Sequence, residues 1–295
     1  MFIALAANLF IAVSKLVAGL ISGSSAMLSE AAHSFADSLN EVFLGISLRR
    51  ARRPPDATHP LGHGRERFLW ALMAAIASFL IGGCLSVFIA IRQFGSHKEA
   101  GSALVSWIVL ALSLAADGTS WLQSIGQARR EARARKRTLI GHLLRTSDPL
   151  VRAIVVEDSA ALIGIVIAAV GLLLRQVLGT NTPDAVASLL IGILLAITAF
   201  GLARPLADFL VGRSLPAPLL LELQKIVEQC PVIEQVLYLQ AVYTGPEEVI
   251  VAAKVRPAKN TTVEQLAREM DHIDQRLRET SEFVADVYLD VTSTA

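Results

Sequence analysis

Long apolar segments, separated by short polar ones, occupy the first two thirds of the chain. A transmembrane helix needs about 20 consecutive, mostly apolar residues. Six segments meet that length: Phe2–Ser22, Ala26–Leu48, Phe68–Phe94, Leu104–Ile125, Leu150–Val177 and Asp184–Leu206. The pattern therefore predicts an all-α membrane bundle of six transmembrane helices.

The pattern changes near Gly212, where charged and polar residues become frequent. Apolar residues recur at helical spacing over Leu219–Gln229 and Thr261–Thr280, and β-branched, partly alternating segments cover Val232–Tyr243, Glu248–Arg256 and Phe283–Val291. This order, αββαβ, predicts a small α+β domain with an antiparallel sheet covered on one face. Thr262 and Gln265 have the spacing of a capping box. We therefore expect a membrane domain over residues 1–211 and a second domain over 212–295.

Composition agrees with a membrane protein and excludes some partners. The 295 residues are 53% hydrophobic and 18% charged, whereas soluble domains carry about 25% charged residues, so we expect the lipid bilayer to surround much of the chain. A net charge of +1 gives no basic surface for a nucleic acid. Cys84 and Cys230 form no CxxC pair, so we expect neither a disulfide framework nor a thiolate metal site.

Basic residues gather on one side of the predicted bundle. They follow the second segment at Arg49–Arg53, the fourth at Arg129–Arg137, and flank the end of the sixth at Arg204 and Arg213. Cytoplasmic loops carry the excess of Lys and Arg. We therefore expect both termini in the cytoplasm, and a protein integral to a bacterial inner or plasma membrane.

The second apolar segment contains ionisable residues, which are costly in a bilayer and mark functional sites. His33 and Asp37 are four residues apart and share one helix face. An imidazole nitrogen and a carboxylate oxygen suit zinc. Glu30 and Asn40 fall near the same stripe. The alternative is a His–Asp hydrogen bond that only tightens helix packing.

Two adjacent acids, Glu157 and Asp158, lie inside the fifth apolar segment. They repel each other unless a cation or a proton is present. Neighbouring residues point about 100° apart on a helix, so we expect only one of them to face the site of His33 and Asp37. Glu157 can alternatively be solvated at the membrane surface. Asp117, in the fourth segment, can carry protons, support the metal ligands, or join two helices by a hydrogen bond.

The loop after the second segment is rich in glycine and proline. It contains Asp56, His59 and His63 within a span of eight residues. An acid and two histidines at this spacing can bind a metal ion at the cytoplasmic entrance. The alternative is that both histidines are ordinary solvated loop residues.

Taken together, these features resemble the cation diffusion facilitator family. The resemblance is carried by the following stretches: Ser29–Asp37 (SEAAHSFAD), His59–Arg65 (HPLGHGR), Glu157–Ala161 (EDSAA) and Pro183–Ala185 (PDA). It implies six transmembrane helices, a ferredoxin-like C-terminal domain and a homodimer. It also implies transport of Zn²⁺ or another divalent transition metal in exchange for H⁺, by alternating access, with no cofactor and no enzymatic reaction.

Carried over by residue, the resemblance makes His33, Asp37 and Asp158 metal ligands, and Asp56 and His63 a peripheral metal site. A histidine at the first of these positions is typical of zinc-selective members. The family commonly has a second histidine four residues before the fifth-segment acid, where this chain has Ile154, and Glu157 either replaces that ligand or does not.

Other readings stay open. An intramembrane metalloenzyme is disfavoured because the chain has no HExxH motif. A membrane metal sensor or scaffold without transport is a further alternative. The ion can also be Mn²⁺, Fe²⁺ or Co²⁺, although the nitrogen of His33 favours zinc. The C-terminal segment contains one histidine, His272, so we expect a dimerisation module without a full metal cluster.

Overall fold

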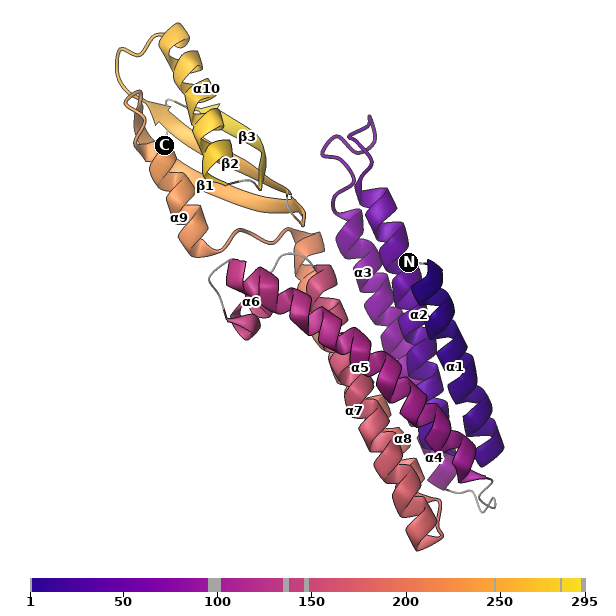
Figure 1. Ribbon diagram of the computed structural model, residues 1–295. Helices are drawn as coiled ribbons and strands as arrows, with labels where there is room; N and C mark the ends of the chain where they lie inside the picture. The colour runs from indigo at the N-terminus through magenta and orange to yellow at the C-terminus, as the bar shows by residue number, and fades with distance from the viewer. Residues whose placement is uncertain are drawn as a thin grey trace. The chain divides into compact units, whose positions relative to one another are not determined.

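The computed structural model describes residues 2–94, 102–134, 138–145, 149–246, 248–281 and 283–292. It contains two compact units (Figure 1). The first comprises residues 1–49 and 69–207, and the second comprises residues 50–68 and 208–295. Part of the predicted basic segment Arg129–Arg137, residues 135–137, lies outside the described residues.

All six predicted apolar segments are helical. They correspond to α1 (Phe2–Ser22), α2 (Ser25–Ala51), the continuous series α3 (Glu66–Ala77), η1 (Ser78–Cys84) and α4 (Leu85–Phe94), α5 (Ala103–Ala134), α7 (Pro149–Leu178) and α8 (Thr182–Val211). The element η1 is a π-helical stretch inside the third segment. A short helix that we did not predict, α6 (Leu139–Arg145), follows α5.

Five helices within the described residues are long and apolar enough to cross a membrane, namely α1, the α3–α4 series, α5, α7 and α8. Many of their apolar side chains are exposed, as for Phe10 (73%) and Ile197 (66%), and lipid is the solvent that suits such surfaces. The protein is therefore an integral membrane protein. Helix α2 has 27 residues and is more polar than these five, because its sequence contains several serines together with Glu30, His33 and Asn40.

Small residues bring the helices of the first unit close together. Ala18, Ala26, Ala160 and Ala168 belong to its buried core. Gly192 on α8 faces α4 so closely that an added Cβ would lie 2.9 Å from the backbone nitrogen of Val87. Close backbone contact through small side chains is the usual means of helix association in membranes.

The second unit contains a three-stranded sheet in the order β1–β2–β3. Its elements are α9 (Ala217–Glu228), β1 (Ile233–Gly245), β2 (Glu248–Pro257), α10 (Val263–Thr280) and β3 (Val284–Val291), which confirms the order αββαβ. Strands β1 and β2 form an antiparallel hairpin, whereas β3 runs parallel to β2. The prediction of an antiparallel sheet was therefore wrong for β3, because the intervening helix α10 returns the chain to the same end of the sheet.

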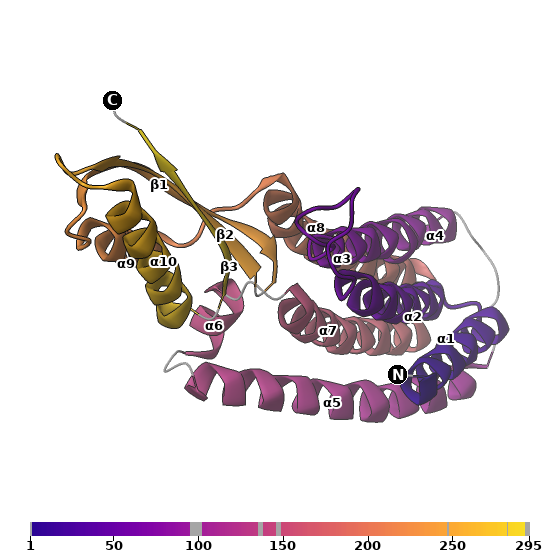
Figure 2. The same cartoon turned by 90° about the horizontal axis from the view of Figure 1, so that it is seen from above.

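One face of the sheet is covered by helices. Alternate residues of β2 are buried, together with Leu223 and Val227 of α9 and Ile273 and Leu277 of α10. Figure 2 shows α9 and α10 next to each other. The predicted capping box at α10 is present: Thr262 Oγ1 accepts from the Gln265 amide at 3.2 Å, and Gln265 Oε1 accepts from the Thr262 amide at 3.1 Å.

The loop of residues 50–68 belongs to the second unit. Phe68 stacks on Phe209 with ring centroids 4.7 Å apart, and Phe209 meets the edge of Tyr243 on β1 at 5.3 Å. Gly64 approaches the turn between β1 and β2, where an added Cβ would lie 2.7 Å from the Thr244 carbonyl oxygen. These contacts connect the loop to the sheet.

Candidate metal sites

His33 and Asp37 lie on consecutive turns of α2. The distance from His33 Nδ1 to Asp37 Oδ1 is 3.5 Å. Both ring nitrogens of His33 and Asp37 Oδ1 are buried without a hydrogen-bond partner among the described residues. Two ligands about 2.0–2.2 Å from a tetrahedral zinc ion lie roughly 3.3–3.5 Å apart. The pair therefore has the spacing and the free donor atoms to bind one ion.

A cavity of about 480 Å³ lies beside this pair in the first unit. Its acidic and amide lining residues are Asn8, Asp37, Asn40, Glu41, Asp117, Gln123, Glu157 and Asp158. Both Glu157 and Asp158 of α7 border it, and the expectation that only one of them faces the site of His33 and Asp37 stays a prediction. The cavity is wide enough for two neighbouring positions of one helix to line it.

Each acid of α7 is held by a hydrogen bond. Asn40 Nδ2 donates to Glu157 Oε1 at 2.5 Å, and Ser120 Oγ donates to Asp158 Oδ2 at 3.3 Å. This arrangement disfavours the alternative of a Glu157 solvated at the membrane surface. Ile154, one turn before Asp158, also lines the cavity, so an apolar side chain stands where the family resemblance led us to look for a nitrogen ligand.

Lys15 on α1 is a charged residue that the sequence analysis missed. Its side chain is fully buried, and Nζ lies 3.0 Å from Glu30 Oε2 and 2.9 Å from Ser34 Oγ. Asp117 Oδ2 is 3.6 Å from the same nitrogen. Lys15 lies in a long apolar segment, and an ionisable residue in such a segment is itself the signal that could have identified it. Among the alternatives for Asp117, the structure favours a link between helices.

Asp184, at the start of α8, is fully buried. It accepts hydrogen bonds from Ser24 Oγ at 2.6 Å, from the Ser25 amide at 2.5 Å and from Ser25 Oγ at 2.9 Å. Arg175 Nη1 is 3.9 Å from the carboxylate. A carboxylate at the first turn of α2 satisfies amide groups that the helix itself leaves unpaired. Asp184 therefore joins α2 to α8.

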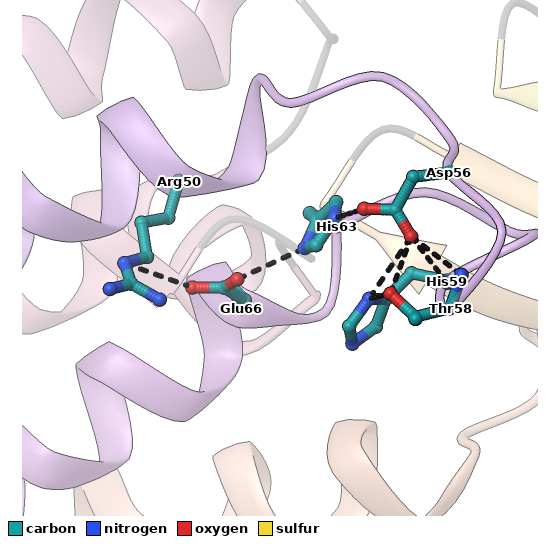
Figure 3. Close-up of polar contacts among 6 residues, drawn as sticks. All are labelled: Arg50, Asp56, Thr58, His59, His63 and Glu66. Carbon is teal, nitrogen blue, oxygen red and sulfur yellow. Dashed lines mark hydrogen bonds and ion pairs between the residues drawn. The ribbon is translucent and has the colours of Figure 1, made fainter.

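The loop acid and histidines come together as the sequence indicated (Figure 3). Asp56, His59 and His63 each offer one ligand atom, and these atoms all lie within 4.8 Å of one another. His63 Nε2 is 3.0 Å from Asp56 Oδ2, and His59 Nδ1 is 3.5 Å from Asp56 Oδ1. The other ring nitrogen of His63 is 3.0 Å from Glu66 Oε1. This geometry can accept a metal ion.

The same contacts shift the pKa values of Asp56 and His63. Hydrogen bonds from the Thr58 hydroxyl and from His63 hold the pKa of Asp56 well below its usual range. The hydrogen bond to Asp56 raises the pKa of His63 above 6.5. The His63–Asp56 pair therefore stabilises the metal-free loop below pH 6.5, and that contribution is lost as pH rises through the raised pKa.

We expect NMR titration of the metal-free protein to place the His63 pKa above 6.5. Asp56→Asn should lower this value, because the amide lacks the negative charge that favours imidazolium. Thr58→Ala is the matched control, since it keeps the Asp56 carboxylate. A His63 pKa that does not change in Asp56→Asn would show that the pair is not formed.

A third group of donors lies in the sheet unit. Cys230 Sγ and His272 Nδ1 are 3.7 Å and 3.8 Å from the same oxygen, Oε2 of Glu269 on α10. Cys230 and His272 are far apart in the sequence, because 41 residues, including the strands β1 and β2 and the first half of α10, lie between them.

Comparison with known proteins gives a consistent result. A family model described as the cation efflux transmembrane domain matches residues 1–211. A relative from Mus musculus, named a mitochondrial proton-coupled zinc antiporter, is 29% identical over 268 residues, which cover 91% of this chain and 47% of the relative. Metal tolerance protein C4 of Arabidopsis thaliana is 28% identical over 225 residues, covering 76% and 49%.

An uncharacterized transporter of Methanocaldococcus jannaschii is 24% identical over 288 residues, covering 97% of this chain and 94% of the relative. The chain thus spans about half the length of the mouse and Arabidopsis relatives and nearly all of the archaeal one.

Proposed function

Since the chain belongs to the cation efflux family, a family of membrane transporters, we propose that it exports zinc from the cytoplasm in exchange for protons. The observation that carries the proposal is the pair of His33, which is buried, and Asp37, whose side chain is 29% exposed. Their facing Nδ1 and Oδ1 atoms are 3.5 Å apart, and both atoms are buried without a hydrogen-bond partner among the described residues. The names of the mouse and Arabidopsis relatives, a zinc antiporter and a metal tolerance protein, support the same choice.

The proposed zinc ligands are His33, Asp37, Asp158 and Glu157. Glu157 takes the place of the nitrogen ligand that Ile154 cannot supply, and the hydrogen bond from Asn40 fixes the direction of its carboxylate. One imidazole and three carboxylates are acceptable ligands for a tetrahedral zinc ion. Mn²⁺, Fe²⁺ and Co²⁺ are the competing ions, and the single nitrogen favours zinc over manganese.

The proposed exchange follows from the chemistry of these ligands. Zinc binds only deprotonated imidazole and carboxylate groups, so binding releases protons and protonation releases zinc. Zinc from the cytoplasm displaces protons from His33 and the acids. The site then opens to the opposite side, where protons displace the metal. The reference pKa of an imidazole, about 6.5, lets such a group change charge within the working pH range.

We further propose that α2 is the sixth span, that residues 1–211 form the membrane domain and residues 212–295 a ferredoxin-like cytoplasmic domain, and that two copies form a homodimer. Both termini lie in the cytoplasm. The membrane is a bacterial inner or plasma membrane. A mitochondrial membrane is the alternative that the name of the mouse relative raises.

Asp56, His59 and His63 form a proposed peripheral site for the same ion. Their ligand atoms are close enough for one metal, and the loop belongs to the unit that contains the sheet. We propose that metal bound there changes the loop without being transported.

Purified protein in liposomes tests the function directly. With zinc outside, a zinc-sensitive dye inside and an imposed pH gradient, wild-type protein should give zinc flux that depends on the gradient and a proton flux that depends on zinc. Zinc binding without flux above that of protein-free liposomes would contradict transport and favour a metal sensor or scaffold. Competition by Mn²⁺, Fe²⁺ or Co²⁺ then ranks the ions.

A further inference from the structure

Lys15 places a positive charge within a group of oxygen atoms from two other helices. Its ammonium contacts the Glu30 carboxylate and the Ser34 hydroxyl of α2 at 3.0 Å and 2.9 Å. The Asp117 carboxylate of α5 lies 3.6 Å away. An ammonium group has three N–H donors. The three groups around this one, two carboxylates and a hydroxyl, all offer oxygen atoms. This is the coordination that a hard cation, such as Mn²⁺ or Ca²⁺, also prefers.

The oxygen group borders the proposed zinc site. Ser34 and Asp117 line the same cavity as Asp37, Glu157 and Asp158. Glu30 precedes His33 by three positions on α2, and its second oxygen, Oε1, is buried without a hydrogen-bond partner among the described residues. Without a cation at Lys15, the carboxylates of Glu30 and Asp117 would be left buried or half-buried and uncompensated, next to three further acids.

We propose that Lys15 is a built-in occupant of a second cation site, formed by Glu30, Ser34 and Asp117, and that it thereby determines metal specificity. This inference rests on the proposed zinc site at His33 and Asp37. By occupying the oxygen-only site, the ammonium keeps Glu30 and Asp117 out of the zinc ligand set. The ligands that stay available then include the nitrogen of His33, which favours zinc.

Removal of the ammonium should open the second site to a divalent ion. Lys15→Met keeps a long side chain but leaves two carboxylates and a hydroxyl facing one point. We expect this variant to bind one more divalent ion per chain than wild type, measured by equilibrium dialysis with elemental analysis. Its preference for Mn²⁺ over Zn²⁺ should rise at least about tenfold, because the new ligands are all oxygen.

The double variant Lys15→Met with Glu30→Gln is the matched control. It removes the ammonium and one of its two carboxylates, so it should return to the wild-type number of ions. Lys15→Arg retains the positive charge and should also bind the wild-type number. An equal ion count and an equal Mn²⁺/Zn²⁺ preference in Lys15→Met and wild type, with both eluting as folded protein, would overturn the inference.

Asp117→Asn provides a test that does not depend on the folding of Lys15→Met. It leaves Lys15 paired with Glu30, so the inference requires an unchanged zinc affinity. A loss of more than about tenfold would show that Asp117 is a metal ligand and not a partner of Lys15. None of these measurements needs transport. Absent zinc flux in wild type would therefore count against the proposed function, whereas equal ion counts would count against the role of Lys15.

Discussion

Asp37→Ala is expected to weaken zinc binding by at least about 100-fold and to reduce zinc flux to the level of protein-free liposomes. Loss of a residue that only orients a ligand typically costs 10–100-fold in affinity, and the loss of a ligand should cost no less. The effect should be large here because Asp37 Oδ1 and the nitrogens of His33 have no hydrogen-bond partner among the described residues. In the proposed site, zinc is the partner of these atoms.

The measurement is calorimetric titration with zinc in a chain that already carries Asp56→Ala and His63→Ala, so that the loop does not contribute. His33→Ala should behave like Asp37→Ala. Ser38→Ala is the control on the same helix, since its hydroxyl donates to the Ser34 carbonyl and does not line the cavity. Full zinc affinity in both His33→Ala and Asp37→Ala would refute the site.

Asp184→Ala is expected to destabilise the protein by about 3–5 kcal/mol, the usual effect of removing one partner from a buried ion pair. The substitution leaves the Arg175 guanidinium buried beside it, and three donors at Ser24 and Ser25 lose their acceptor. Helix α2 would then lose the contact that fixes its first turn against α8, the end opposite to its basic C-terminal residues.

Thermal unfolding in detergent, followed by the loss of the folded elution peak, measures this effect. Asp184→Asn should be milder, because the amide oxygen can still accept from a serine. Gly201→Ala, also on α8 and with open space around the position of an added Cβ, should be close to neutral. A melting temperature within a degree or two of wild type for Asp184→Ala would contradict the structural role of this carboxylate.

Element type was largely predictable from the sequence. Apolar length predicted the long helices of the first unit but not the short helix α6, and alternation with β-branched residues predicted β1, β2 and β3. The helix signal at α10 extended to its cap, where Thr262 and Gln265 exchange the expected hydrogen bonds. These features are local, because periodicity and capping depend on residues within one or two turns. The pairing of β3 was not local, since its direction depends on the course of α10 across the sheet.

The same distinction between local and non-local features applies to the candidate site residues. His33 and Asp37 could be placed on one helix face from their spacing alone. For Asp56, His59 and His63 the sequence indicated only that an acid and two histidines share one loop. The position of Glu157 could not be predicted, because whether it borders the cavity depends on the rotation of α7 against α2. Lys15 has no charged neighbour in sequence, and its three partners lie 15 or more positions away.

The sequence by itself determined that this chain is a membrane protein with an unusually polar second helix, and that its candidate metal ligands lie at helical or loop spacing. The tertiary structure alone decided which charges share one environment. Both acids of α7 border the cavity, Glu30 and Asp117 lie next to the ammonium of Lys15, and Asp184 is hydrogen-bonded to the start of α2. The physical reason is that a buried charge must be compensated by whichever group the packing of helices brings near it, and that group can lie anywhere in the chain.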